Sequence, residues 1–414
     1  MTAAALTSPA AASRTVTTVR SDTAGELLGL LPARGGLSWV RHGEGLVGWG
    51  EAARLEISGP RALAEAADWW DRFTAGLDVA DELRVPGSGP VVFASIAFDP
   101  AAGTSVFVVP EVVVGRRHGV GWITAVGAAP ELPESAPADD GPAPRLRYAD
   151  GALDPASWCA AVAAAVVRID AGELEKVVLA RDLLVSSDVP LAPRRMLRRL
   201  AARFPGCWTF AVDGLLGATP ELLLRRTGRR LSSRVLAGTA PRGAGAADER
   251  LAEALLNSAK DRAEHALAVD SLVRALEPYC GELTAPAEPE LLTLANVRHL
   301  ATDVVGTQRD SAGLLELVGA VHPTAAVCGT PTPDAAALIG ELEGMDRGRY
   351  AGPVGWLDAA GDGEFGLALR CAELVGDDGA RLFAGCGIVA GSDPAAELAE
   401  TQSKFAAFQA ALEG

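Results

Sequence analysis

The sequence alternates β-rich runs with helix-like segments, without the strict strand–helix repeat of a βαβ protein. Runs such as VVFASIAF and TSVFVVPEVVVGRR are rich in β-branched and aromatic residues and are bounded by turn residues. Residues 155–171, 193–203, 248–279 and 393–412 have helical patterns. Several β-rich runs follow one another directly, which favours antiparallel pairing. We therefore predict an antiparallel or mixed sheet with helices packed on its outside.

The composition is that of a globular protein and excludes several classes of function. Hydrophobic residues make up 49% of the 414 residues and charged residues 22%, which excludes extended disorder. The formal net charge of −16 argues against nucleic acid as a partner, because phosphate backbones demand clustered Lys and Arg. No run approaches the roughly 18 apolar residues of a membrane span. The six cysteines form no C-x-x-C pair, so we expect free thiols and a cytoplasmic protein.

Lysine is rare enough in this chain to single out candidates for chemistry. Of the 37 basic residues only three are lysine, namely Lys176, Lys260 and Lys404. A general preference for arginine codons explains the bias, but a lysine that survives it is a candidate for a site that requires an amine. Lys176 begins the apolar run KVVLA and shares a strand face with Val178 and Ala180. These apolar surroundings favour a neutral amine, which can act as a base.

Two predicted helices each carry a pair of carboxylates on one face. Asp261 and Glu264 are three residues apart in one helix, and Glu397 and Glu400 are three apart in the last helix. Lys404 lies one turn beyond Glu400 on the same face. The two pairs could together form an all-oxygen Mg²⁺ site. On spacing alone, solvated helix faces with ion pairs, such as Glu400 with Lys404, are the commoner explanation.

A series of ordered motifs resembles the chorismate-utilising enzymes, the family of isochorismate, salicylate, anthranilate and aminodeoxychorismate synthases. The motifs are EKVVLAR, ATPELL, LAGTAPRG, SAKDRAEH, RHL, HPTAAVCGTP, RGRYAGPVGW, ALRC, AGCGIV and AELAETQSK. These ten segments lie between about residue 155 and residue 412, in the family's order. The resemblance implies a single large α/β (α+β) fold. Two packed β-sheets flanked by helices form an α/β/α-like sandwich, with the active site between them.

The resemblance and the composition together divide the chain into three parts. Residues 1–21 are predicted to be a flexible tail, because they are rich in Ala, Thr and Ser and lack the apolar segment of a signal peptide. Residues 22–150 are the variable N-terminal part of the same fold, where LSWVRHGEGLVGWG resembles isochorismate synthases of the menaquinone type. Residues 151–414 form the chorismate-binding catalytic region. The Pro-rich, acidic stretch 129–144 is expected to be a loop within this fold.

Residue types at two motif positions imply that water, and not ammonia, is the nucleophile. Lys176 occupies the position where water-using members carry a general base and ammonia-using members are expected to carry glutamine. Aminodeoxychorismate synthases that form a covalent adduct are expected to carry lysine at the position of Ala237. No glutamine amidotransferase segment is present, so no such partner is expected. The resemblance thus implies an isochorismate synthase, an isomerase that adds water at C2 of chorismate and removes the C4 hydroxyl.

The resemblance also assigns the acid and base groups. Lys176 would deprotonate the attacking water, and Glu221 in ATPE would protonate the departing C4 hydroxyl. The apolar residues Leu222 to Leu224 favour a raised pKa of the Glu221 carboxyl, as an acid requires. His299 resembles a family residue near the ring and C4, and a structural hydrogen bond would explain it equally.

The remaining assignments concern Mg²⁺ and the two substrate carboxylates. Glu264 and Glu400 would bind Mg²⁺ directly and Asp261 and Glu397 through water, with Asp261 standing where many relatives carry the longer Glu. The chorismate carboxylates would be held by backbone donors, a hydroxyl and cations, namely Gly238, Thr239, Tyr350, Arg370, Gly385 and Lys404. We expect the enzyme to act as a monomer.

Three alternatives stay open at the level of sequence. A salicylate synthase uses the same base and acid and then eliminates pyruvate. An isochorismate synthase can also supply a catechol siderophore, although the N-terminal resemblance favours menaquinone. A catalytically inactive binding or scaffold homologue is disfavoured, because Lys176, Glu221, Glu264 and Glu400 are intact.

Overall fold

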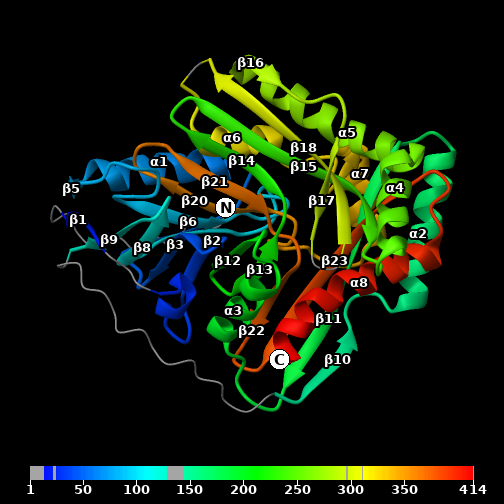
Figure 1. Ribbon diagram of the computed structural model, residues 1–414, viewed down its shortest axis with the longest axis horizontal. Helices are drawn as coiled ribbons and strands as arrows, with labels where there is room; N and C mark the ends of the chain where they lie inside the picture. The colour runs from blue at the N-terminus through cyan, green and yellow to red at the C-terminus, as the bar shows by residue number, and fades with distance from the viewer. Residues whose placement is uncertain (1–13, 22–24, 128–143, 295–296, 310, 414) are drawn as a thin grey trace.

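Two large β-sheets pack face to face and are flanked by helices (Figure 1). The computed structural model describes residues 14–21, 25–127, 144–294, 297–309 and 311–413. Neighbouring strands in these ranges are antiparallel, apart from one parallel pair near the N-terminus. This arrangement confirms the predicted mixed sheets with helices on the outside.

The first sheet has 13 strands and joins both halves of the chain. In spatial order they are β10 (Leu146–Asp150), β11 (Lys176–Ser187), β23 (Gly379–Val389), β22 (Cys371–Val375), β13 (Leu215–Thr219), β12 (Trp208–Val212), β2 (Leu37–Arg41), β3 (Glu44–Trp49), β8 (Val112–Arg117), β9 (Val120–Val126), β1 (Arg14–Arg20) and β5 (Leu77–Asp81), with β19 (Gly329–Thr330) beside β11.

The second sheet has 10 strands and also mixes early and late segments of the chain. In spatial order they are β16 (Cys280–Thr284), β18 (Val297–Gln308), β15 (Arg230–Pro241), β14 (Leu222–Thr227), β21 (Gly363–Leu367), β20 (Pro353–Asp358), β6 (Val91–Ser95), β7 (Ser105–Val109) and β4 (Ala53–Ile57), with β17 (Glu290–Thr293) beside β18.

A continuous hydrophobic core fills the space between the sheets. Trp39 and Phe210 of the first sheet meet Phe93, Trp356 and Phe365 of the second in one buried cluster. Full burial of such a side chain contributes about 1.5–3 kcal/mol. The aromatic layer therefore fixes how the two sheets lie on each other, and hence which strand ends meet at the cleft described below.

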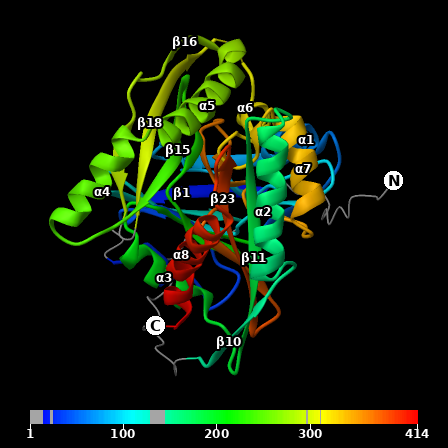
Figure 2. The same cartoon turned by 90° about the vertical axis from the view of Figure 1, so that its right-hand side faces the viewer.

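The helices cover the outer faces of the sheets (Figures 1 and 2). They are α1 (Ala62–Ala75), α2 (Pro155–Asp170), α3 (Pro193–Arg203), α4 (Ala246–Asn257), α5 (Ala259–Leu276), α6 (Leu314–Val321), α7 (Thr332–Leu342) and α8 (Pro394–Glu413), with short 3₁₀ helices at Leu27–Leu30 and Glu277–Tyr279. Helices α2, α3, α7 and α8 pack on the first sheet, whereas α1, α4, α5 and α6 pack on the second. Asp393 caps α8 by accepting a hydrogen bond from the backbone N–H of Ala396, as its sequence position predicts.

Two of the predicted segments are wrong. Residues 14–20, within the predicted tail, form β1, which pairs in parallel with β5 and antiparallel with β9; Val16 and Thr18 are fully buried there. The single helix predicted over 248–279 is two helices, because Ser258 interrupts it and its hydroxyl caps α5 by accepting from the Asp261 N–H. Residues 1–13 of the predicted tail, and all but one residue of the loop 129–144, lie outside the described residues.

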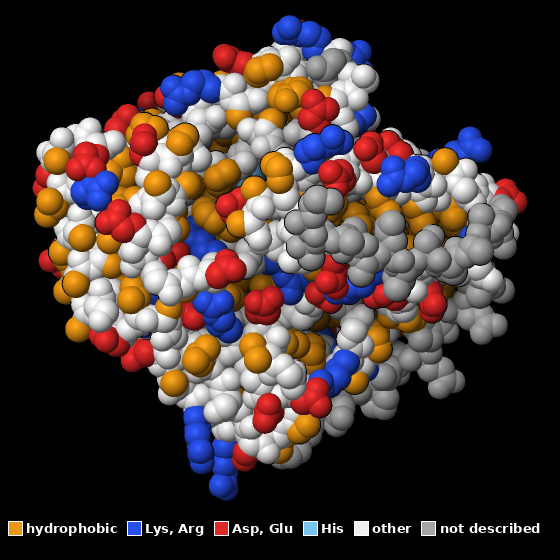
Figure 3. All heavy atoms as spheres, turned by 180° about the vertical axis from the view of Figure 1, so that it is seen from behind, with side chains coloured by type: hydrophobic (Ala, Val, Ile, Leu, Met, Phe, Trp, Pro, Cys, Tyr) orange, Lys and Arg blue, Asp and Glu red, His pale blue; other side chains and the backbone are white. Residues whose placement is uncertain are grey.

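Across the described part of the chain, no helix combines the length and apolarity needed to cross a membrane. On the face that Figure 3 shows, acidic and basic side chains are interspersed. The described side chains on that face therefore form no continuous basic surface of the kind a phosphate backbone demands.

Candidate active site

One polar cleft collects nearly all the residues that the sequence singles out. Twelve of the thirteen predicted site residues line it, and they come from both sheets and from helices α5 and α8. In chain order they are Glu221, Gly238, Thr239, Asp261, Glu264, His299, Tyr350, Arg370, Gly385, Glu397, Glu400 and Lys404. The thirteenth, Lys176, lies immediately behind the wall formed by Glu264 and Gly387.

Lys176 is a fully buried amine that starts β11. Its Nζ lies 2.9 Å from Oε1 of Glu264, and within the described residues it makes no hydrogen bond. Its neighbour on the same strand face, Val178, lines the cleft as the alternation of a strand requires. The amine was expected to sit in apolar surroundings, but in this structure it is paired with a carboxylate. A positive charge on Lys176 is therefore compensated locally.

Glu221 is a buried carboxyl directly before β14. Burial raises the pKa of Glu221 to about 8, and the charges of Lys176, Lys404 and Arg370 only partly oppose that rise. The carboxyl therefore carries a proton at neutral pH, as a general acid must. The apolar residues Leu222 to Leu224 predicted that the pKa of Glu221 would be raised. The burial that raises it comes from the folded protein around Glu221.

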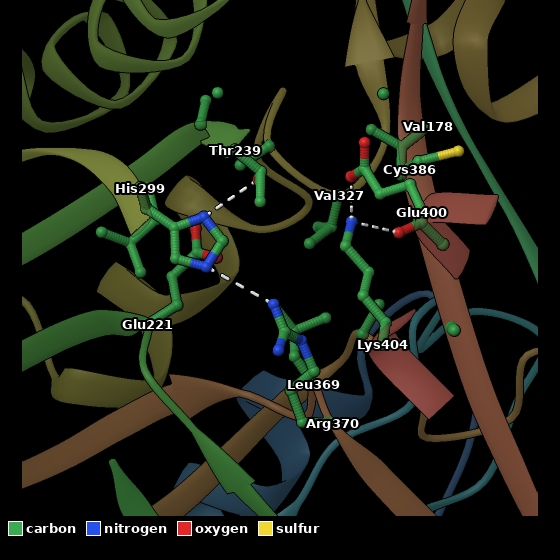
Figure 4. Close-up of a pocket in the computed structure, with 18 of the residues that line it drawn as sticks. Val178, Glu221, Thr239, His299, Val327, Leu369, Arg370, Cys386, Glu400 and Lys404 are labelled. Carbon is green, nitrogen blue, oxygen red and sulfur yellow. Dashed lines mark hydrogen bonds and ion pairs between the residues drawn. The ribbon is translucent and has the colours of Figure 1, made fainter. Parts of the chain in front are cut away.

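His299 joins the two sides of the cleft through its ring nitrogens (Figure 4). Its Nδ1 lies 3.0 Å from Oγ1 of Thr239, and its Nε2 lies 3.4 Å from a guanidinium nitrogen of Arg370. Burial, with the charges of Arg370 and Lys404, lowers the pKa of His299 to about 3, so the ring is neutral. Because arginine can only donate, Nε2 is the acceptor, and the ring proton sits on Nδ1 and is donated to Thr239.

Arg370 is held in a single orientation at the floor of the cleft. Its backbone has a φ of 50°, its carbonyl accepts from the Ala218 N–H at 3.2 Å, and its guanidinium donates to His299. Burial lowers the pKa of Arg370, but a guanidinium keeps its positive charge in proteins. Figure 4 shows Arg370 and Lys404 pointing into the same space between His299 and Glu400. The two cations can therefore meet one anionic ligand.

Three of the four carboxylates that α5 and α8 bring to the cleft are each paired with a lysine. Glu264 pairs with Lys176, Glu397 lies 3.8 Å from Lys260, and Glu400 lies 2.7 Å from Lys404. The Glu400–Lys404 pair is the helix-face ion pair that the spacing allows, but it faces the cleft. Asp261 instead receives a hydrogen bond from Ser258 at the start of α5. Lys404 also donates to the carbonyl of Gly385 at 2.6 Å.

The charges of these carboxylates shift each other's titration. Burial raises the pKa of Glu397, and the neighbouring Glu400 raises it further. Burial also opposes ionisation of Glu400, but Lys404, Arg370 and Lys260 outweigh it and lower the pKa of Glu400. A buried carboxylate, Glu397, beside a partly exposed one, Glu400, is an electrostatic setting that a divalent cation relieves.

The donor set fits an oxygen-preferring divalent cation in its chemistry. Four carboxylates from facing helices line one cleft, and carboxylate oxygens are the ligands that Mg²⁺ prefers. Gly387 leaves room beside them, since a Cβ at that position would lie 2.5 Å from Oε1 of Glu264. Among the described residues, no three His, Cys, Asp or Glu side chains are grouped closely enough to hold a metal as they stand. The lysine partners occupy the carboxylates instead.

The sequence missed the residues that support the cleft wall. Arg347 is buried and forms a charged pair with Glu343, donates to the carbonyls of Val178 and Val327, and lies 4.3 Å from the ring centroid of Phe98. Tyr350, which was predicted, stacks on Phe383 at 4.9 Å between ring centroids. The four-residue spacing of Glu343 and Arg347 is a signal that could have pointed to this support.

The cleft and the fold match known proteins over most of the chain. Residues 131–413 match the family described as chorismate binding enzyme. The chain is 41% identical over 378 residues to the Mycobacterium tuberculosis protein named "Putative isochorismate synthase MenF", covering 86% of this chain and 95% of that protein. It is 33% identical over 403 residues to isochorismate synthase MenF of Bacillus subtilis, covering 89% and 85%.

A solved structure supports the fold. The menaquinone-specific isochorismate synthase MenF of Escherichia coli superposes with a TM-score of 0.82 at 24% identity, covering 97% of this chain and 95% of that one. At this identity the likeness concerns the fold.

Proposed function

The chain belongs to the chorismate-binding enzyme family, and from that premise we propose that it is an isochorismate synthase. The observation that carries the proposal is the buried Glu221 carboxyl, whose pKa burial raises to about 8, in the cleft that the Lys176–Glu264 pair borders. Converting chorismate to isochorismate needs a base that takes a proton from water at C2 and an acid that protonates the departing C4 hydroxyl. The site offers one candidate for each task.

Glu221 has the properties of the acid. It is protonated at neutral pH, and it lies beside the cations that would hold an anionic substrate. Delivering its proton to the C4 oxygen leaves a carboxylate that Lys176, Lys404 and Arg370 stabilise electrostatically. Glu221 therefore keeps its proton until the reaction, and nearby cations offset the negative charge that it carries afterwards, as a general acid requires.

Lys176 has the properties of the base, once its contact with Glu264 is broken. Its Nζ lies 2.9 Å from Oε1 of Glu264, so a base role requires this contact to open and leave the amine facing the attacking water. A cation that took Glu264 would remove the partner that now holds the fully buried Lys176.

We propose that the carboxylates of chorismate are bound by two groups of residues. The backbone of Gly238 and Thr239 would donate to the ring carboxylate. Arg370, with Tyr350 and the backbone of Gly385 beside it, would bind the enolpyruvyl carboxylate in bidentate fashion. Lys404 would neutralise the charge between them. The contacts of His299 make it a residue that positions Arg370, and its predicted action near C4 stays a prediction.

Magnesium is the cation we propose for the carboxylates. Glu264 and Glu400 would hold it directly, with Asp261 and Glu397 through water. When bound, it would supply Lewis-acid polarisation of the ring carboxylate as C2 is attacked. We further propose that the enzyme acts as a monomer, without a glutamine amidotransferase, in the cytoplasm.

The products formed from chorismate and Mg²⁺ test this function. Chromatography should show isochorismate in equilibrium with chorismate and no pyruvate. Pyruvate released in step with chorismate loss would establish a salicylate synthase instead. No conversion at any Mg²⁺ concentration, by a folded protein that still binds chorismate, would favour an inactive homologue. Loss of menaquinone after deletion of the gene would place the product in that pathway, and loss of a catechol siderophore would place it in the other.

A further inference from the structure

A second cavity lies between the two sheets, apart from the active-site cleft. Its volume is about 750 Å³, within the range of small-molecule sites of about 300–1,000 Å³. The first sheet contributes β1, β2, β8, β9 and β12, and the second contributes β14, β15 and β18. Strand β15 links the two sites, since Arg234 lines the cavity and Gly238 lines the cleft. Leu236 of the same strand also lines the cleft, so the two sites are two residues apart along β15, or roughly 7 Å.

The cavity concentrates positive charge in an acidic protein. Six arginines line it, namely Arg20, Arg41, Arg117, Arg225, Arg230 and Arg234, whereas the described lining contains two carboxylates, Glu82 and Asp303. The whole chain has a net charge of −16, so this grouping opposes the average composition. A cavity lined by this much positive charge attracts small anions.

Part of this charge is neutralised by the protein and part of it is left over. Arg234 forms a two-point contact with Asp303 at 2.6 and 2.7 Å. Arg117 and Arg225 share the buried carboxylate of Glu364 behind the wall. Arg41 has a different environment: its Nε donates to the carbonyl of Gly206 at 2.9 Å, and its guanidinium lies 4.1 Å from the centroid of the Trp208 ring. It is thus oriented by a backbone carbonyl and an aromatic face.

Near Arg41, the positive charges of Arg234 and Arg225 act more strongly than the opposing charges of Cys207 and Glu364. Burial lowers the pKa of Arg41, and the charges of Arg234 and Arg225 lower it further. An anion placed among the three guanidiniums would reverse those repulsions.

The cavity lining also includes apolar side chains, which we call its apolar wall. Leu83, Val85 and Pro86 follow β5, and Leu222 and Val305 come from the second sheet. A ligand that satisfies both the arginines and the apolar wall needs a hydrophobic body and an anionic group, with the planar geometry that guanidinium pairs with best. Inorganic phosphate would satisfy only the arginines.

We propose that this cavity binds a small organic anion, a ring that carries one or more carboxylates. Two kinds of molecule share that chemistry, namely a cyclic dicarboxylate such as chorismate and a planar aromatic carboxylate. The site is separate from the catalytic groups, and the proposal does not depend on the reaction proposed above.

Calorimetric titration of the full chain tests the proposal, with 2-naphthoate as the aromatic carboxylate and chorismate as the cyclic dicarboxylate. Both are titrated into Arg370→Gln as well as the unmodified chain, so that active-site binding is weakened while the cavity is intact. We expect saturable binding of at least one of them to Arg370→Gln. Chorismate binding would identify the dicarboxylate as the ligand type, and binding of 2-naphthoate alone would identify the aromatic one.

Variants of the cavity then locate the binding. Arg41→Gln should weaken it at least about tenfold, the effect of losing a charge-assisted contact. Arg230→Gln should weaken it less; this side chain is exposed, so the variant should fold normally and the test holds even if Arg41→Gln does not. Arg72→Gln removes an exposed arginine from α1 and should change nothing.

Three results would overturn the proposal. One is the absence of saturable binding of either carboxylate to Arg370→Gln. Another is equal affinity for Arg230→Gln, a folded Arg41→Gln and the unmodified chain. The third is inorganic phosphate binding as tightly as the carboxylates, which would remove the role of the apolar wall.

Discussion

The Nζ atom of Lys176 lies 2.9 Å from Oε1 of Glu264, so the candidate base and a candidate metal ligand form one ion pair. The pair joins the start of β11 to helix α5, which belong to opposite sheets of the sandwich. A cation that takes Glu264 would deprive Lys176 of its partner. Metal binding and the protonation of the base are therefore expected to be coupled, and the predictions below separate the two.

Replacing Lys176 tests the base. Lys176→Ala should lower kcat at least about 10²-fold, the usual contribution of a positioned general base. Lys176→Arg is the matched variant, because it keeps the positive charge beside Glu264 but cannot lose a proton at working pH. Both variants should be equally slow in steady-state assays. A rate near that of the unmodified enzyme in either one would remove Lys176 as the base.

Glu221 should set the alkaline limb of the pH profile. Its raised pKa of about 8 means that kcat/KM should fall as the pH rises through that value, because the proton is lost. Glu221→Gln should be nearly inactive. His299 should add no inflection near neutrality, since burial lowers its pKa to about 3. An alkaline limb that persists unchanged in a residual activity of Glu221→Gln would contradict the assignment.

The same carboxyl should make the protein less stable at high pH. The folded-state pKa of Glu221, about 8, lies above its ordinary value of 4.5, so between these pH values the folded chain keeps a proton that the unfolded chain has lost. This contribution to the free energy of unfolding is fully present below about pH 4.5 and decreases until the pH passes about 8. Glu221→Gln should therefore gain in Tm relative to the unmodified protein between pH 6 and pH 9. An identical pH dependence of Tm in both would show that Glu221 ionises normally.

Arg370 should act on substrate binding and depend on its fork-shaped geometry. Arg370→Gln should raise KM for chorismate by about 10- to 100-fold, the range for a lost charge-assisted contact. Arg370→Lys should recover little of this, because an ammonium cannot form the bidentate contact or the same bond to His299. Steady-state kinetics separate KM from kcat. A full recovery by Arg370→Lys would show that charge alone matters.

Removing one carboxylate should weaken the dependence on Mg²⁺. Glu400→Gln should raise the Mg²⁺ concentration for half-maximal activity by at least about tenfold. The rise in Tm that Mg²⁺ gives the unmodified protein should also shrink in this variant, which provides a readout independent of activity. Glu253→Gln, an exposed carboxylate on α4, is the matched control. Equal metal titrations for Glu400→Gln and Glu253→Gln would remove Glu400 from the site.

The sequence predicted most of the site, because the chemistry demands specific residue types at fixed positions in ordered motifs. Glu221 precedes an apolar strand, and the pairs Asp261–Glu264 and Glu397–Glu400 follow helical spacing. Such local patterns also predicted the helices over 155–171 and 193–203 almost to the residue. The errors occurred where local composition conflicts with long-range pairing, as in β1, whose Thr-rich sequence reads as a tail until β5 and β9 are placed beside it.

By itself, then, the sequence determined which groups are candidates for the chemistry and in which elements they lie, since helical and strand periodicity act over a few residues. Tertiary structure alone decided how these groups meet: the partner of Lys176, the burial that keeps Glu221 protonated, the tautomer of His299 and the arginine-lined cavity. These features depend on contacts between residues tens to hundreds of positions apart. Charge compensation and desolvation arise from such contacts, and no local pattern in the chain encodes them.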